Sequence, residues 1–434
     1  MNRDTTLLLV GGIDETVRKA KRLGLHVLLL QHPSKLTAEQ EELADVLHVL
    51  DFTEWSQIEP VVAELWERPG FAVALSLTEP GLENAGRIND KYGLGGTSYE
   101  VAHRIRDKWA MRRHLADVEP AVAAMPLRDR EDLDVFAGRT GYPFIVKPVD
   151  GTASLGVFRV DGPEDVDRVW SRVDGLRGVR TDRVSTLFVL QDFLMEEYVD
   201  GPEYSVEAFS FASRHSIVAV TEKFVDQGTF AELGHVVPAR IPAETEARIR
   251  AAVRRFLDAV GLRDGVSHTE VRVGPRGPVI IESHNRIAGD AITDLVVGAY
   301  GIDLTTYAVG WPFGLVAELP ADPQPHRGAC VRFLVGEPGR VSSVDGVDAA
   351  LSEPDVLVAR VSAKPGDEVR PLRDNWDRLG LVGVSAADST AAIERAAELI
   401  RDTIDIRIAG ADGREHRARV AEPASRSRLT GSAA

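Results

Sequence analysis

Short apolar runs alternate with polar, helix-capable stretches at the start of the chain. Thr6 to Val10 is apolar, Asp14 to Leu23 is polar with helical character, and Val27 to Leu30 is apolar again. A further apolar run covers Ala72 to Leu77. Apolar strands separated by a helical stretch are typical of a parallel sheet with helices on its faces. We therefore predict that residues 1–110 form one α/β domain.

The middle of the chain changes to strands that are joined by turns. Gly138 to Val160 contains two strand-like segments around a glycine-bearing loop, and Leu187 to Phe193 and Glu203 to Phe211 are each strand-like. Val266 to Ser283 has the pattern of a β-hairpin, whereas Ala243 to Val260 is strongly amphipathic and precedes a glycine, which favours a helix that ends there. This mixture predicts an α+β architecture.

The last quarter of the chain reads as a further mixed unit. Val296 to Gly314 is predicted to be helical, and proline and glycine residues then mark a boundary around Pro320 to Gly328. A strand is expected at Ala329 to Leu334 and a helix at Ser389 to Ile404. The polar tail at residues 422–434 is predicted to be disordered.

The composition narrows the classes of partner. The chain has 434 residues, of which 44% are hydrophobic and 27% charged, a balance typical of a globular protein with several domains. Its formal net charge of −16 argues against nucleic acid, because a surface that binds the phosphate backbone is basic. Cys330 is the single cysteine, and we find neither a secretory leader nor an apolar stretch of the ~20 residues that span a bilayer. We expect a cytoplasmic protein that binds neither nucleic acid nor membrane.

The first candidate for chemistry is Lys147, which ends the apolar strand at Phe144. A lysine in such a position is costly to bury unless an anion neutralises it. Gly151 to Gly156 follows, and its small residues form a loop whose backbone N–H groups could close over phosphates. A surface lysine beside a β-hairpin turn explains this pattern equally well.

Five carboxylates lie around the turn between residues 196 and 207. Glu207 follows Tyr204, Ser205 and Val206 inside a strand, where a carboxylate is less expected than at a turn. A solvated acidic hairpin tip is the alternative interpretation.

A late pair of carboxylates points to a metal. Glu270 and Glu282 lie in apolar strands that pattern as hairpin partners, and two such carboxylates repel one another unless a cation lies between them. Mg²⁺ takes oxygen ligands from one or two carboxylates and from substrate phosphates. Arg286 follows and could neutralise a phosphoryl group in transfer. Two structural salt bridges are the alternative, while zinc is disfavoured because His268 and His284 lack its usual ligand patterns.

The order of these features resembles the ATP-grasp superfamily. A lysine after a strand, a small-residue loop, an acidic hinge, and two carboxylates with an arginine after the second occur in both. The resemblance begins near residue 96 and covers nearly the whole chain. It implies that Lys108 and Lys147 contact the phosphates of ATP and that Ser154, Leu155 and Gly156 form the flexible phosphate loop.

The resemblance also implies the adenosine and metal contacts. Glu196, Glu197, Tyr198 and Val199 resemble the hinge that holds adenine, largely through backbone groups, and Glu203 falls where the family contacts the ribose hydroxyls.

In the same way, Glu270 and Glu282 match the Mg²⁺ ligands, and Arg286 stays in register. The family commonly ends this segment as Glu-x-Asn-x-Arg, whereas His284 stands at the Asn position here. Either Asn285 or His284 is therefore the third metal ligand.

Two segments are similar to L-amino-acid (dipeptide) ligases of this superfamily. Residues 222–224 followed by 230–239 resemble their substrate-side loop. Residues 365–367, with 374–375 and 378–380, resemble their C-terminal lid domain. This implies a ligase that uses ATP and Mg²⁺ to activate a small-molecule carboxylate as an acyl phosphate and joins it to an amine. Lys108, Lys147, Arg286 and the metal would offset charge in the transition state. Glu222, His268 or a substrate group would take the proton of the amine, and a homodimer is expected.

The implied fold class is α/β and α+β, with four domains and a tail. A Rossmann-like pre-ATP-grasp domain (1–110) precedes the small lobe (111–200) and large lobe (201–320) of an ATP-grasp core. A C-terminal lid domain (321–421) completes the large lobe before the tail (422–434). A biotin-carboxylase-like or nucleotide-biosynthetic ligase and a non-catalytic nucleotide-binding regulatory protein are the alternative functions.

Overall fold

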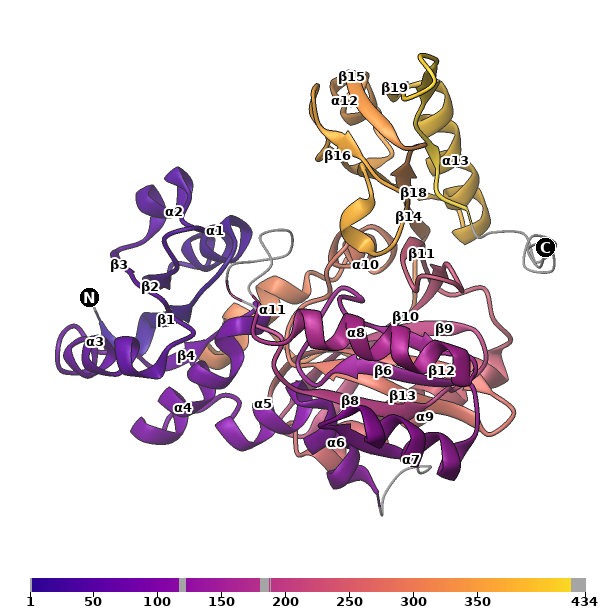
Figure 1. The fold of residues 1–434 in the computed structure, drawn as a ribbon. Coiled ribbons are helices and arrows are strands. Elements are labelled where there is room, and N and C mark those ends of the chain that lie inside the picture. The colour runs from indigo at the N-terminus through magenta and orange to yellow at the C-terminus, as the bar shows by residue number, and fades with distance from the viewer. Residues whose placement is uncertain (1, 117–121, 180–186, 188, 423–434) are drawn as a thin grey trace.

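Four β-sheets organise the chain in a computed structural model that describes residues 2–116, 122–179, 187 and 189–422 (Figure 1). The first sheet is parallel and belongs to the N-terminal unit. The other three are antiparallel where their strands pair. The largest of them runs from the middle of the chain into its C-terminal part.

The N-terminal sheet has the strand order β3-β2-β1-β4. Both faces of β1 are covered, because Leu7 and Leu9 pack toward α1 and α11 while Leu8 and Val10 pack toward α3 and α4. This explains why the strand is continuously apolar rather than alternating. The elements are β1 (Thr6–Val10), α1 (Asp14–Arg22), β2 (His26–Gln31), α2 (Ala38–Leu43), β3 (Val46–Val49), α3 (Trp55–Glu67), β4 (Val73–Leu75), α4 (Leu82–Tyr92) and α5 (Tyr99–Arg106), and α11 is Leu304–Gly310.

A four-stranded sheet of order β5-β8-β6-β7 follows, with α7 and α8 packed on it. Its core is formed by Phe136, Phe144, Val146, Val169 and Phe193. The elements are α6 (Lys108–Leu115), β5 (Ala124–Leu127), α7 (Arg130–Thr140), β6 (Phe144–Pro148), β7 (Phe158–Val160), α8 (Val166–Leu176) and β8 (Phe193–Glu197).

The largest sheet has nine strands, with β13-β12-β9-β10-β11-β14-β18-β16 in order and β21 paired to β14. One face of its first strands packs against the amphipathic helix α9, through residues such as Val206 and Phe256. The elements are β9 (Glu203–Phe211), β10 (Arg214–Val225), β11 (Glu232–Val237), α9 (Ala243–Val260), β12 (Gly265–Gly274), β13 (Gly277–His284), α10 (Ile292–Tyr300), β14 (Gly328–Val335), β16 (Val356–Val361), β18 (Gly380–Ala386) and β21 (Arg419–Val420).

The last sheet, of order β17-β15-β19-β20, lies at the C-terminal end of the molecule (Figure 1). Helix α13 packs on β14 and β18 of the large sheet, so the two sheets share one core that includes Cys330, Val382 and Ile406. The elements are β15 (Gly339–Asp345), α12 (Val347–Leu351), β17 (Glu368–Val369), α13 (Ser389–Asp402), β19 (Asp405–Gly410) and β20 (Glu415–Arg417).

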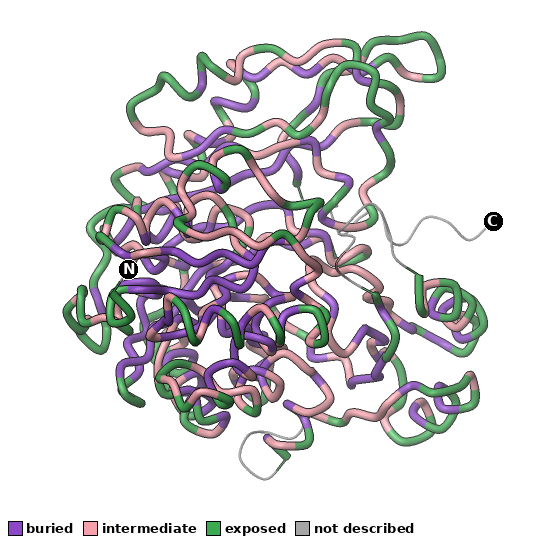
Figure 2. Tube along the Cα trace, turned by 90° about the vertical axis from the view of Figure 1, so that its left-hand side faces the viewer, coloured by how far each residue is buried: buried purple, intermediate pink, exposed green. Residues whose placement is uncertain are grey.

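Burial follows this layering, because buried residues concentrate in the central strands while helices alternate between buried and exposed positions (Figure 2). Within the described part of the chain, no helix is both long enough and apolar enough to cross a membrane.

Two predicted elements differ from the observed ones. The strand expected at Leu187 to Phe193 begins only at Phe193 and runs to Glu197, where the residues pair with β5 and β6. The single helix expected over Val296 to Gly314 is two helices, because Gly301 adopts a left-handed conformation (φ 68°) that ends α10. The predicted tail covers residues 422–434, of which residues 423–434 lie outside the described residues.

Gly201, in the turn before β9, has no room for a side chain. Its φ is 121°, and a Cβ atom built there would lie 2.2 Å from the carbonyl oxygen of Val273. We expect Gly201→Ala to lower the free energy of unfolding by more than the ~1–3 kcal/mol that an unfavourable φ costs alone. Gly366→Ala is the matched control, since Gly366 has φ 98° and open space around it. Equal losses in urea denaturation of the two variants would refute the clash.

Candidate active site

A cavity of about 310 Å³ lies between the β5-β8-β6-β7 sheet and the large sheet and is also lined by residues of the C-terminal part. Of the residues proposed from the sequence, it is lined by Lys108, Lys147, Ser154, Leu155, Glu196, Glu197, Tyr198, Val199, Glu203, His268, Glu270, Glu282, His284 and Arg286. Three others, Gly156, Glu222 and Asn285, are not among its lining residues.

The floor of the cavity is one face of the large sheet. Strand residues alternate between the two faces, so Glu203, Ser205 and Glu207 lie on the side opposite α9. The same face carries His268 and Glu270, which are the Cα partners of Glu207 and Ser205. Glu282 and His284 continue the row because they pair with Glu270 and His268. The β-register therefore gathers polar side chains from successive strands on one surface.

Two lysines, Lys108 and Lys147, lie at one side of this surface. The Lys108 Nζ donates to the Gly151 carbonyl at 2.8 Å and lies 3.1 Å from a Glu282 oxygen. Burial opposes its charge, but the Glu282 carboxylate raises the pKa of Lys108. Lys147 Nζ lies 2.7 Å from Glu196, and burial lowers the pKa of this lysine. Both ammonium groups therefore already have anionic partners.

Glu196 has a structural role that its position in the sequence did not reveal. Its carboxylate binds Arg112 at 2.7 Å as well as Lys147, and all three side chains are buried. Although burial opposes ionisation, Arg112 and Lys147 lower the pKa of Glu196 to about 2. Arg112 also donates to the carbonyl groups of Ile280 and Ile281, so this side chain links α6 and Glu196 to β13.

The loop of residues 151–156 contacts the segment before β11, on the other side of the cavity. Ser154 adopts a left-handed φ of 59°, and its hydroxyl donates to the carbonyl of Phe230 at 3.1 Å. Gly156, at the end of the loop, also has a positive φ and packs near Pro148.

Glu270 and Glu282 face one another on adjacent strands, as the hairpin pattern predicted. Burial opposes both charges, yet Lys223 lowers the pKa of Glu270 to about 2, and Lys108 holds the pKa of Glu282 well below its usual value. Ionised carboxylates side by side in a cavity are the oxygen donors that Mg²⁺ prefers. The residues present therefore fit this ion.

His284, rather than Asn285, lies on the carboxylate face. Its Nε2 is 3.1 Å from a Glu282 oxygen, whereas Asn285 follows the end of β13 and is not among the residues that line the cavity. Asn285 is buried with no hydrogen-bond partner for its Oδ1 in the structure. Of the two proposed third ligands, His284 is therefore the one that geometry favours.

Lys223 is a central residue that the sequence placed in the substrate-side segment without giving it a role of its own. Only 2% of its side chain is exposed, and its Nζ binds Glu203 at 2.8 Å and Glu232 at 2.6 Å as well as Glu270. Burial alone would lower the pKa of Lys223, but these carboxylates raise it well above its usual value. Glu203, the residue proposed for the ribose, also accepts from Arg272 Nε at 3.0 Å.

Glu222, the neighbour of Lys223, does not join the cavity. It points to the other face of β10 and forms an ion pair with Arg240 at 2.8 Å. This corrects its proposed role as acceptor of the amine's proton. The alternative acceptor, His268, does lie in the cavity, but burial is outweighed by Glu207, which lies 2.9 Å away and raises the pKa of His268 to about 9. At neutral pH this imidazole already carries its proton.

The N-terminal unit contributes a residue that the sequence analysis missed. Glu79 follows β4 and is buried with its carboxylate 2.6 Å from Arg286 Nε and 2.9 Å from His284 Nδ1. Despite burial, these groups hold the pKa of Glu79 well below its usual value. An acid at the carboxyl end of a parallel strand is the signal that could have identified it.

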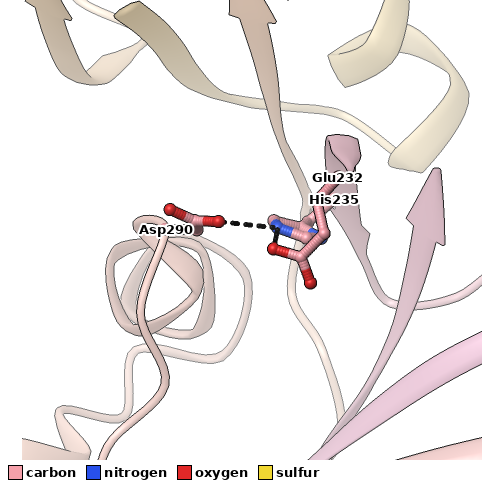
Figure 3. A group of neighbouring side chains, drawn as sticks. All are labelled: Glu232, His235 and Asp290. Carbon is pink, nitrogen blue, oxygen red and sulfur yellow. Dashed lines mark ion pairs between the residues drawn. The ribbon is translucent and has the colours of Figure 1, made fainter. Parts of the chain in front are cut away.

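A further cluster lies around β11 (Figure 3). His235 is fully buried, and its Nε2 lies 3.7 Å from Glu232 and 3.9 Å from Asp290. Glu232 and Asp290 line the cavity, together with Asn375, Trp376 and Arg378 from the C-terminal part.

Two family models match the chain. Residues 140–294 match the ATP-grasp domain, and residues 332–409 match the L-amino acid ligase C-terminal domain 2.

The chain is also similar to individual proteins, and its fold is similar to that of a solved structure. The alanine–anticapsin ligase of Bacillus subtilis (strain 168) is 28% identical over 247 residues, which are 53% of this chain and 52% of that protein. The protein y4rH of Sinorhizobium fredii is 27% identical over 393 residues, 88% of this chain and 79% of that one. The crystal structure of an L-amino acid ligase from Bacillus licheniformis superimposes with a TM-score of 0.79 at 21% identity, covering 94% of this chain and 99% of the other.

Proposed function

We propose that this chain, which belongs to the ATP-grasp ligases, joins the carboxylate of one amino-acid-like molecule to the amine of another and consumes ATP in doing so. The observation that carries the proposal is the row Glu203, Glu270, Glu282 and Arg286 along one wall of a cavity that also holds Lys108. The match of residues 332–409 favours an amino-acid ligase over the biotin-carboxylase-like and nucleotide-biosynthetic alternatives.

The cavity supports a two-step reaction. A carboxylate oxygen of the first substrate attacks the γ-phosphorus of ATP, the bond to the β-phosphate oxygen breaks, and ADP leaves with that electron pair. The amine nitrogen of the second substrate then attacks the carbonyl carbon of the acyl phosphate. Inorganic phosphate leaves with the electron pair of the broken C–O bond and takes up the proton that the amine loses, and an amide remains. Positioning and charge stabilisation supply most of the catalysis in such phosphoryl transfers.

We assign the charge-stabilising roles to residues that line the cavity. Lys108 and Lys147 exchange their carboxylate partners for phosphate oxygens, and Arg286 faces the transferring group. Glu270 and Glu282, with His284 beside them, would hold Mg²⁺, and the bound ion would supply further neutralisation of the phosphates. The loop around Ser154 covers the phosphates and excludes the water that would hydrolyse an acyl phosphate.

We assign the contacts to adenosine to the hinge at residues 196–199. We propose that backbone groups of Glu197, Tyr198 and Val199 hold adenine, since the side chain of Glu196 is occupied by its ion pairs. The domain boundaries at residues 110, 200, 320 and 421 and a homodimeric assembly belong to the same proposal. Light scattering of the purified protein tests the assembly.

The direct test is phosphate release from MgATP with each amino acid, singly and in pairs, followed by product mass. We expect release that requires one particular pair and a product lighter than their sum by one water. Phosphate release that is independent of any amine would contradict amide formation. ATP binding without turnover on any pair would instead favour a regulatory nucleotide-binding protein.

A further inference from the structure

A short turn of the C-terminal part reaches into the cavity. It joins β17 to β18, contains a 3₁₀ helix at Asn375–Asp377, and begins at Asp374, whose side chain accepts from the backbone N–H of Trp376 at 2.9 Å. Three of its residues, Asn375, Trp376 and Arg378, line the cavity.

Two side chains fix this turn to the large lobe. Asn375 accepts from the backbone N–H of Glu232 at 2.8 Å and donates to the Glu232 carboxylate at 3.0 Å. Arg378 donates two hydrogen bonds, each 2.8 Å long, to the two oxygens of Asp290. Its guanidinium also lies 3.8 Å from the centre of the Phe333 ring. The turn is therefore held on both sides of Trp376 by contacts of defined geometry.

Between the contacts of Asn375 and Arg378, the side chain of Trp376 is only partly covered by other residues. It is 45% exposed although it lines the cavity. A large aromatic side chain held with its surface toward a cavity gives much contact area to a ligand, and a fixed position lowers the entropy lost on binding. This makes the indole a surface for a substrate rather than part of the core.

The charged side chains near Trp376 already have partners of opposite charge. The Glu232 carboxylate binds Lys223 at 2.6 Å and Asn375 at 3.0 Å, and the Asp290 carboxylate is taken up by Arg378. A cationic substrate side chain would therefore have to displace Arg378 or Lys223, and an anionic one would meet two carboxylates. An uncharged, apolar side chain neither has to displace a cation nor is repelled by the carboxylates.

We propose that Trp376 is a specificity-determining residue of this ligase, and that its indole packs against the apolar side chain of one of the two amino-acid substrates. The inference rests on the proposed function and adds to it a class of substrate. Asn375 and Arg378 act as positioning residues, because they set the place of the indole through Glu232 and Asp290.

The test compares kcat/KM for alanine, leucine, phenylalanine, glutamate and arginine in wild type, Trp376→Ala and Trp376→Phe. We expect wild type to prefer leucine or phenylalanine, and Trp376→Ala to lose about tenfold in kcat/KM for these, as loss of an apolar contact of this size costs. Its KM for ATP and its kcat/KM for alanine should change by less than about twofold, and Trp376→Phe should keep most of the preference. Leu351→Ala is the control, since Leu351 is 50% exposed in the same C-terminal part and does not line the cavity.

Equal losses for all five amino acids, or none, in Trp376→Ala would overturn the inference, as would a wild-type preference for glutamate or arginine. Calorimetric titration of leucine and phenylalanine into protein loaded with a non-hydrolysable ATP analogue separates the two proposals. Binding that needs Trp376 without any turnover would refute the ligase function and keep the specificity role. Turnover without a dependence on Trp376 would do the reverse.

Discussion

Replacing Glu282 with alanine is expected to abolish ATP turnover. The substitution removes one of the two facing carboxylates and leaves the buried Lys108 without its ion-pair partner. Loss of a single preorganised electrostatic contact lowers kcat by ~10²–10³-fold, and this change removes two functions together. ADP formation from MgATP in the presence of the substrate pair measures the loss.

Glu222→Ala is the matched control for this variant. Glu222 is also a strand glutamate in an ion pair, but it points to the other face of its sheet and binds Arg240. It should keep the ADP formation rate of wild type. If Glu282→Ala retained ADP formation at the level of Glu222→Ala, the assignment of Glu282 to the metal would be wrong.

Replacing Lys223 with alanine is expected to lower the free energy of unfolding by ~3–5 kcal/mol, the usual result of removing one partner from a buried ion pair. The Lys223 ammonium holds Glu203, Glu232 and Glu270 together, and these carboxylates would repel one another without it. Urea denaturation at neutral pH measures the loss.

The same variant should recover stability as the pH falls. Without the ammonium, the pKa values of the three carboxylates rise in the folded state, so folding takes up protons and becomes more favourable at lower pH. Lys91→Ala is the control, because Lys91 pairs with Glu59 at the surface and should show no measurable change at either pH. A loss in Lys223→Ala that did not depend on pH would point to lost packing instead of charge.

The elements that the sequence predicted best are those with a strong local pattern. Helix α9 was predicted with its observed limits, because its apolar face repeats with the helical period and Gly261 ends it in a left-handed conformation. The hairpin of Glu270 and Glu282 followed from two apolar strands around a glycine turn. In both cases the information lies within about 20 residues of sequence.

The features that were missed depend on contacts between distant parts of the chain. Glu79 contacts His284 and Arg286, which lie more than 200 residues later in the sequence, and no local sequence pattern predicts such a contact. The proposal of Glu222 as an acceptor of the amine's proton is a different case, because it concerns the face of a single strand. Because Thr221 pairs with Ser205, the alternation of side chains along β10 already places Lys223 on the cavity face. Knowledge of this strand pairing would therefore have placed Lys223, and not Glu222, on the cavity face.

The large sheet also determines how this protein could be recombined with its relatives. Strand β11 pairs with β14, Gly234 opposite Arg332 and Val237 opposite Ala329, so the catalytic floor and the C-terminal part share an uninterrupted ladder of backbone hydrogen bonds. A chimera that takes its C-terminal part from another ligase must reproduce this register as well as the contacts of Asn375 and Arg378. Suitable crossover points therefore lie in the connection before Gly328, outside the strands, and libraries that cut within the sheet would yield mostly misfolded proteins.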